Sequence, residues 1–345
     1  MSTRGIIAER MVRRAESSES HPEHQRLRTG LLRWFRIHGR DLPWRRTHDP
    51  YAILVSEFML QQTQVATVLP YYERWLERFP GFAALARAKE SDVLHAWQGL
   101  GYYARARNLH AAAKSVRQNF AGRLPADATR IAQLPGVGRY TAGAVASFAF
   151  DLPEPIVEAN VGRVLARLTN LRVPIDTAAG RAHLWRAAIA LLPASGAREH
   201  NSALIDLGAL LCLPRQPRCF ECPVRRSCRA ANPASLPIKK KKPATVRLME
   251  PHLFTRDKGR VLLEHSQKRW RGMWILPRLS APPKRRPLLQ LDFPFTQHRI
   301  TLAVFAPRGE FVPSDKQRWF SLRALQRLPL PSPHRRALNQ LLPAS

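Results

Sequence analysis

Four cysteines, the only ones in the chain, lie within seventeen residues as C-x6-C-x2-C-x5-C: Cys212, Cys219, Cys222 and Cys228. A chain kept inside the cell rarely forms disulfides, so this spacing indicates a metal site. Four thiolates suit either zinc or a [4Fe–4S] cluster. Zinc ribbons usually pair two C-x2-C knuckles, whereas only Cys219 and Cys222 are that close here. The spacing by itself leaves both metals open.

A glycine-rich turn is the second chemical feature. The string Leu134-Pro135-Gly136-Val137-Gly138 lies between two segments with helical periodicity. Its glycines permit a tight turn, and the backbone N–H groups that open the next helix can face a phosphate. A carboxylate, Glu158, follows Gly136 by 22 residues and stands just before another helical segment. Turns of this kind are common between helices, so the significance of this one depends on the motifs around it.

Helices are expected to position these residues. From about residue 25 to residue 231, apolar residues recur at helical spacing with short Gly and Pro interruptions and little strand-like alternation. This part is therefore predicted to be all-helical. The clearest segments are 65–79, 92–97, 109–120, 141–149, 161–168 and 181–192.

The amino-acid composition and its pattern change on both sides of that region. Residues 1–24 are polar, and we predict a disordered tail. Residues 232–245 are rich in proline and lysine and are predicted to be a linker. Residues 246–345 form the last predicted domain, which is α+β. Its β-prone runs are 246–254, 259–265 and 299–305, and its helix-like pieces are 322–328 and 334–342.

The net charge of the chain favours one class of binding partner. The 345 residues include 56 Lys and Arg against 25 Asp and Glu, a net charge of +31. A surplus of this size favours a polyanion, although an arginine-rich proteome would produce the same excess. The N-terminus lacks the apolar core of a secretory signal, and no apolar run is long enough to span a bilayer. We therefore expect a cytoplasmic protein, of the bacterial nucleoid-associated type, with no membrane partner.

Longer motifs carry a resemblance to a known family. They are LPWR at 42–45, SEFMLQQTQV at 56–65, WQGLGYYARARNL at 97–109 and the stretch 201–208. With the glycine turn, Glu158 and the cysteine loop, they resemble adenine DNA glycosylases of the MutY type, in the helix-hairpin-helix superfamily. This resemblance covers about residues 28–230. It continues more weakly through RGMWILP at 271–277 and WFSL at 319–322, which are similar to the family's MutT-like (Nudix-like) domain that senses 8-oxoguanine.

The resemblance implies a fold and a cofactor. The fold is a mainly α helix-hairpin-helix glycosylase domain over 25–231 with an iron–sulfur loop at 212–228, plus a smaller α+β MutT-like domain over 246–345. The cofactor is a [4Fe–4S] cluster rather than zinc. The implied partner is double-stranded DNA containing adenine opposite 8-oxoguanine or guanine, bound by a monomer.

The implied catalytic residues are Glu57, Tyr140, Glu158 and Asn160. Glu57 would protonate adenine at N7, and its apolar flanks favour a raised pKa. Glu158 would stabilise the cationic sugar and guide water, but it departs from the family, whose Asp-Gly-Asn-Val reads Glu-Ala-Asn-Val at 158–161. Asn160 would orient this carboxylate. Tyr140 stands where bifunctional relatives carry a Schiff-base lysine, so hydrolysis without strand cleavage is expected.

The implied DNA contacts fall in both domains. In the helical domain they are Arg45, Gln62, Thr63, Leu100, Tyr102, Gly136 and Gly138. Some of these would enter the duplex while adenine is flipped out. In the C-terminal domain the family reads 8-oxoguanine with a Phe-Ser-His loop, which here becomes Phe-Thr-Gln-His at 295–298. Thr296 keeps the hydroxyl, and the histidine either has become Gln297 or is displaced by one position to His298.

Two other functions compete with adenine excision. One is a thymine-mismatch glycosylase of the same superfamily, which can also carry tyrosine beside the hairpin. The other is a catalytically weak mismatch- or lesion-binding protein, suggested by Glu158 and the altered loop. The MutT-like domain favours adenine.

Overall fold

The computed structural model describes residues 22–241, 243–308 and 312–342. The chain divides into two compact units, Met1–Gln61 with Ser115–Lys241 and Gln62–Lys114 with Lys242–Ser345. One division falls inside the stretch predicted as a linker. The divisions after Gln61 and Lys114 cut the helical part, and the sequence does not signal them. Most of the predicted tail, 1–24, lies outside the described residues, but α2 already begins at Pro22.

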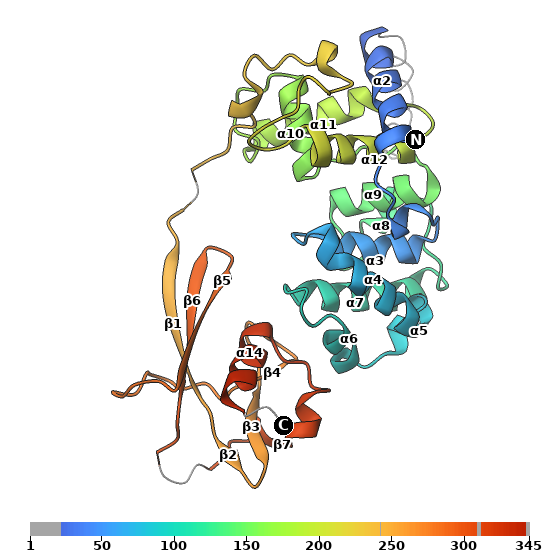
Figure 1. Cartoon of the computed structure of the whole chain (residues 1–345). Helices are drawn as coiled ribbons and strands as arrows, with labels where there is room; N and C mark the ends of the chain where they lie inside the picture. Colours follow the sequence, from blue (N-terminus) through green and yellow to red (C-terminus); the bar gives the residue numbers. More distant parts are fainter. Residues whose placement is uncertain (1–21, 242, 309–311, 343–345) are drawn as a thin grey trace. The chain divides into compact units, whose positions relative to one another are not determined.

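The described part of the first unit is helical (Figure 1). Its α-helices are α2 (Pro22–His38), α3 (Pro50–Leu60), α8 (Ala128–Ile131), α9 (Arg139–Phe150), α10 (Ala159–Leu168), α11 (Ala178–Leu191) and α12 (Ala197–Asp206). Helix α3 begins at Pro50 after Asp49, whose side chain accepts hydrogen bonds from the N–H groups of Tyr51 and Ala52. Every residue from Tyr51 to Met59 is buried, as expected of a central helix that is apolar on all sides, and α3 packs on α9.

The second unit combines helices with two sheets. The helices of residues 62–114 are α4 (Val65–Arg78), α5 (Phe82–Arg87), α6 (Glu90–Ala96) and α7 (Ala104–Asn119), which runs on into the first unit. One sheet has the order β1-β6-β5, with β1 (Val246–Leu253) parallel to β6 (His298–Phe305) and β5 (Leu289–Phe295) antiparallel to it. These three long strands run side by side in Figure 1.

The other sheet is smaller. It contains β2 (Arg256–Asp257), β3 (Arg260–His265), β4 (Trp274–Ile275) and β7 (Gln317–Ser321). Two helices follow it, α13 (Leu322–Leu325) and α14 (Ser332–Leu341), and α14 contacts β5. The predictions of a helical region up to about residue 231 and a small β-rich region after it are therefore confirmed.

The stretch 232–245 is not a free linker along its whole length. Leu236 is buried, and its carbonyl accepts a hydrogen bond from Arg167 Nε at 3.1 Å. The Lys240 N–H donates to both carboxylate oxygens of Asp176. This part packs on the first unit because it carries an apolar side chain that can be buried, which the Pro and Lys content obscures. No helix in the described residues has both the length and the apolar character needed to cross a membrane.

Candidate functional site

Glu57 is a buried carboxyl on the central helix of the first unit. It lies on α3 and is only 5% exposed. Burial, which penalises the charged form, raises the pKa of Glu57 to about 7, and the negative charge of Glu158 raises it further. A hydrogen bond from Tyr140 opposes both effects. At neutral pH this carboxyl is therefore close to half protonated, the condition that suits a general acid.

Tyr140 reaches Glu57 from the neighbouring helix. It lies in the first turn of α9, and its hydroxyl donates the hydrogen bond to the Glu57 carboxyl. Burial, followed by the charges of Glu57 and Glu158, holds the pKa of Tyr140 well above its usual range. The side chain is thus a neutral hydrogen-bond donor and lacks the amine that a Schiff base requires.

Glu158 caps the helix that follows. It is the N-cap of α10, where its two carboxylate oxygens accept hydrogen bonds of 2.8 Å from the backbone N–H groups of Asn160 and Val161. The N-terminus of a helix attracts negative charge. Because its charge acts on both Glu57 and Tyr140, the structure brings these three predicted residues into one electrostatic cluster.

Asn160 contacts Glu158 through its backbone rather than through its side chain. Its Oδ1 instead accepts a 2.8 Å hydrogen bond from Arg163, which also donates to the carbonyls of Gly208 and Cys212. Sequence reasoning missed Arg163. Arg163 links α10, whose N-cap is Glu158, by a hydrogen bond to Cys212 at the start of the cysteine loop.

The cysteine loop holds four free thiols in one short segment. Burial raises the pKa of Cys222 to about 11, and Cys212, Cys219 and Cys228 are near enough to raise it further. No group of three or more His, Cys, Asp or Glu side chains in the described residues is arranged to hold a single metal ion. Four soft thiol donors gathered in one loop do match a four-iron cluster in number and chemistry.

Arg167 anchors this loop and was also missed. It is 1% exposed on α10, and it donates to Cys212 Sγ at 3.2 Å and to the carbonyls of Leu213 and Pro214. A buried guanidinium is stabilised by such acceptors. An arginine followed four residues later by another, Arg163 and Arg167, on the buried side of a helix is the sequence signal that could have identified both.

The glycine turn joins α8 to α9. Gly136 has a φ of +74°, a conformation that strongly favours glycine, and Gly138 is the N-cap of α9. Both are exposed, whereas Val137 between them is buried and anchors the turn. The helix-hairpin-helix arrangement expected from the sequence is therefore present, with its backbone open to solvent.

Two loops of the second unit hold the residues predicted to enter DNA. Gln62 (φ +56°) and Tyr102 (φ +47°) adopt the left-handed conformation, which favours glycine, and Tyr102 is 44% exposed while Leu100 is buried. Arg105 fastens both loops, because its Nη2 donates to Thr63 Oγ1 at 3.1 Å and to the carbonyl of Leu100 at 2.8 Å. Arg105 lies inside the YARARNL string but was not identified from the sequence.

The predicted reader residues form a tight turn. Phe295 pairs with His298 across the β5–β6 hairpin, so Thr296 and Gln297 make the connection. Thr296 has a φ of +52° and is exposed, and its Oγ1 lies 3.4 Å from His298 Nδ1. The two residues expected to contact the base opposite adenine are thus adjacent in space.

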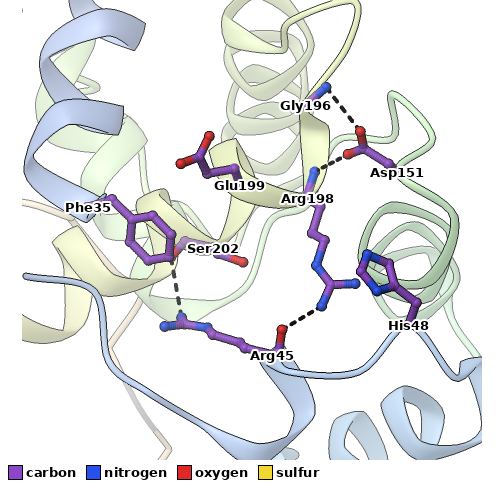
Figure 2. A pocket seen from close by; sticks show the side chains of 8 residues that line it. All are labelled: Phe35, Arg45, His48, Asp151, Gly196, Arg198, Glu199 and Ser202. Atoms are coloured by element: carbon purple, nitrogen blue, oxygen red, sulfur yellow. Dashed lines mark hydrogen bonds between the residues drawn. The ribbon is translucent and has the colours of Figure 1, made fainter. Parts of the chain in front are cut away.

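Arg45 is occupied by intramolecular partners. Its Nη1 lies 2.7 Å from Asp206 Oδ2, and Asp206 is fully buried. Arg45 also lines a pocket of about 290 Å³. Figure 2 shows that Arg198 donates to the Arg45 carbonyl there and that Asp151 accepts from the backbone of Gly196 and Arg198. The geometry gives Arg45 a structural role in joining η1 (Pro43–Arg45) to α12.

Comparisons with known proteins identify the family of the chain. A family model described as "HhH-GPD superfamily base excision DNA repair protein" matches residues 55–187. An adenine DNA glycosylase of Buchnera aphidicola subsp. Schizaphis graminum is 33% identical over 260 residues, covering 74% of this chain and 75% of that protein. The adenine DNA glycosylase of Mus musculus is 43% identical over 212 residues, covering 59% of this chain and 41% of that protein. The chain therefore spans about two fifths of the mouse relative's length.

A solved structure is similar as well. It is described as a thermostable thymine-DNA glycosylase, with a TM-score of 0.55 and 30% identity, and the match covers 60% of this chain and 95% of that one.

Proposed function

The chain belongs to the HhH-GPD superfamily of base excision DNA repair proteins, and from this premise we propose that it is a monofunctional adenine DNA glycosylase. It hydrolyses the N-glycosidic bond of adenine paired with 8-oxoguanine or guanine. The observation that carries this proposal is the pairing of a buried carboxyl, Glu57, with a helix-capping carboxylate, Glu158. Cleaving a purine from deoxyribose needs both an acid for the leaving base and a negative charge for the sugar.

Glu57 acts as the general acid. Its pKa of about 7 leaves a proton available under the conditions in which most carboxyls have lost theirs. Transfer of this proton to adenine N7 turns the base into a neutral leaving group as the bond to C1′ breaks. The Tyr140 hydroxyl then stabilises the carboxylate that remains, because it already donates to that group.

Glu158 acts on the sugar. Its carboxylate balances the positive charge that develops on the ring, and it orients a water molecule that adds to C1′ and gives up a proton to a carboxylate of the site. The products are free adenine and an abasic site in an intact strand. Strand cleavage does not follow, because Tyr140 stands in place of an imine-forming lysine.

DNA recognition uses exposed loops. Gln62, Thr63, Leu100 and Tyr102 enter the duplex and support the base left behind, and the exposed backbone at Gly136 and Gly138 faces a phosphate. The turn with Thr296 and His298 contacts the opposite base through a MutT-like C-terminal domain. What supports these roles is the exposure of Gln62, Tyr102 and Thr296, together with the basic charge of the chain, whereas Leu100 is buried in the free protein.

Cys212, Cys219, Cys222 and Cys228 bind a [4Fe–4S] cluster. The cluster supplies a covalent scaffold that orders the loop, and the loop presents Arg215, Arg218, Arg225 and Arg226, which are all exposed, to DNA phosphates. Arg225 also lies 4.7 Å over the ring of Phe220, which is 90% exposed.

Thymine-mismatch excision is the second candidate, because the thymine-DNA glycosylase structure is 30% identical to this chain. Single-turnover assays on duplexes containing A opposite 8-oxoguanine, A opposite G and T opposite G separate the two functions. Adenine release from the first two duplexes, with no thymine release from the third, is the expected result. Tight binding with no release of any base would leave the protein a mismatch-binding one.

A further inference from the structure

Trp270 lies between two loops of the second unit that are distant in sequence. It is 7% exposed and belongs to the connection between β3 and β4. Its ring is 6.2 Å from the ring of Tyr103 at an interplanar angle of 82°, and 5.8 Å from the ring of Phe295 at 70°. Both are the edge-to-face geometry that aromatic pairs prefer. The three rings form a continuous path from one loop to the other.

The Tyr103 end of the path adjoins the loop proposed to enter the duplex. Tyr103 is 4% exposed, whereas the preceding residue, Tyr102, is 44% exposed. The connection that carries Trp270 is also held directly on α7, because Arg107 Nη1 donates to the Arg271 carbonyl at 2.8 Å. The connection is thus fixed against the loop at 99–103 through Trp270 and against α7 through the adjacent Arg271.

The Phe295 end of the path adjoins the proposed reader turn. Phe295 is the last residue of β5, directly before Thr296. Arg269 lies 4.6 Å from the Phe295 ring centre and pairs with Glu250 of β1 at 2.8 Å. Trp270 and Arg269 both contact the Phe295 ring and so fix its position. Phe295 in turn fixes the position of the turn that follows it.

We propose that Trp270 is a positioning residue that couples the loop at 99–103 to the turn at 295–298, and so contributes to the preference for adenine opposite an oxidised guanine. This specificity role rests on the proposed function, whereas the coupling does not. The base opposite adenine would contact both the loop and the turn. Recognition of that base therefore requires a fixed distance between these two segments. Catalytic placement is sensitive to displacements of about 1 Å.

The indole N–H of Trp270 has no hydrogen-bond partner in the described part of the chain. Its contribution is therefore made by the ring. Trp270→Phe keeps an aromatic ring and is the conservative replacement, whereas Trp270→Ala removes the ring contacts with Tyr103, Phe293 and Phe295. Trp274→Ala is the matched control, because Trp274 lies in the same region but contacts His265 and Phe320 at 5.1 and 4.6 Å.

Hydrogen–deuterium exchange in the DNA-free protein tests the coupling without reference to activity. Trp270→Ala is expected to raise exchange both in peptides covering 98–104 and in peptides covering 293–299. Trp270→Phe should restore most of the protection, and Trp274→Ala should leave both segments unchanged. Faster exchange in one segment alone would show that Trp270 packs locally, and would overturn the coupling.

The ratio of single-turnover excision rates for A opposite 8-oxoguanine and A opposite G tests the specificity role. For Trp270→Ala this ratio is expected to fall about two- to tenfold, the size of one lost aromatic contact, with partial recovery in Trp270→Phe. An unchanged ratio, with the exchange result positive, would refute the specificity role while the coupling stands. Absence of adenine excision in the unaltered protein would instead refute the proposed function.

Discussion

The Tyr140 hydroxyl donates a hydrogen bond to the buried Glu57 carboxyl, joining the first turn of α9 to the central helix α3. This bond stabilises the charged form of Glu57, whereas burial and the nearby Glu158 stabilise the protonated form. Burial is the largest of the three effects, so the pKa of Glu57 settles near 7 instead of near 4.5. The balance predicts how the site responds to substitution and to pH.

Tyr140→Phe should move the alkaline limb of the pH–rate profile to higher pH. Loss of the hydroxyl removes the one interaction among these that lowers the pKa of Glu57, so the general acid keeps its proton at higher pH. Rates of single-turnover adenine excision between about pH 5.5 and 9 measure the shift of this limb. A limb that stays in place, or moves to lower pH, would mean that Tyr140 does not control this carboxyl.

Glu57 should also make the fold less stable as pH rises. Its pKa is about 7 when folded and 4.5 in the reference state, so the folded state binds the proton more tightly. Its stabilising contribution is complete below pH 4.5 and is lost as pH rises through 7, a change of up to about 3 kcal/mol. The unfolding free energy of Glu57→Gln, relative to the unaltered protein, should therefore increase from pH 5 to pH 8. Parallel stability curves for the two proteins would contradict the raised pKa.

Two substitutions at Glu158 distinguish its role as a helix cap from its role as a negative charge. Glu158→Gln keeps a hydrogen-bond acceptor for the start of α10 but removes the charge, so excision should fall strongly with little loss of stability. Glu158→Ala removes both, and should also cost about 0.5–2 kcal/mol of stability. Thermal unfolding and single-turnover rates provide the comparison. If Glu158→Gln retains the full rate, Glu158 is a cap alone.

Loss of any one cysteine should destabilise the first unit and weaken DNA binding. Cys222→Ala removes one of four proposed ligands in the loop that Arg163 and Arg167 join to α10. The purified unaltered protein is expected to contain iron and acid-labile sulfide in equal amounts, whereas the variant should lose both together. Stoichiometric zinc without sulfide in the unaltered protein would overturn the cluster assignment.

Sequence motifs anticipated much of the site, because its chemistry depends on side chains that stand in recognisable strings. Glu57, Tyr140 and Glu158 come from three different helices, and the structure brings them into one cluster. The glycine turn was also predictable, since Gly136 requires a positive φ. Periodicity located the helices for the same reason, as buried faces repeat every three to four residues.

The residues that support the site were harder to predict. Arg105, Arg163 and Arg167 donate mainly to backbone carbonyls. Every residue has a carbonyl, so the sequence does not indicate which ones accept these hydrogen bonds. The same holds for Asp206, whose partners Arg40 and Arg45 lie more than 160 residues away along the chain. The path through Tyr103, Trp270 and Phe295 joins three segments that are distant in sequence, so it follows from the tertiary structure alone.

Single-turnover excision by Glu57→Gln, on a duplex with adenine opposite 8-oxoguanine, tests the central claim most directly. Gln has nearly the same size as Glu but cannot transfer a proton, so DNA affinity measured by titration should be preserved while the rate falls by at least about 100-fold. Preserved affinity with that loss of rate is the predicted result. A variant that binds the duplex and releases adenine at the unaltered protein's rate would contradict the assignment of Glu57 as the general acid.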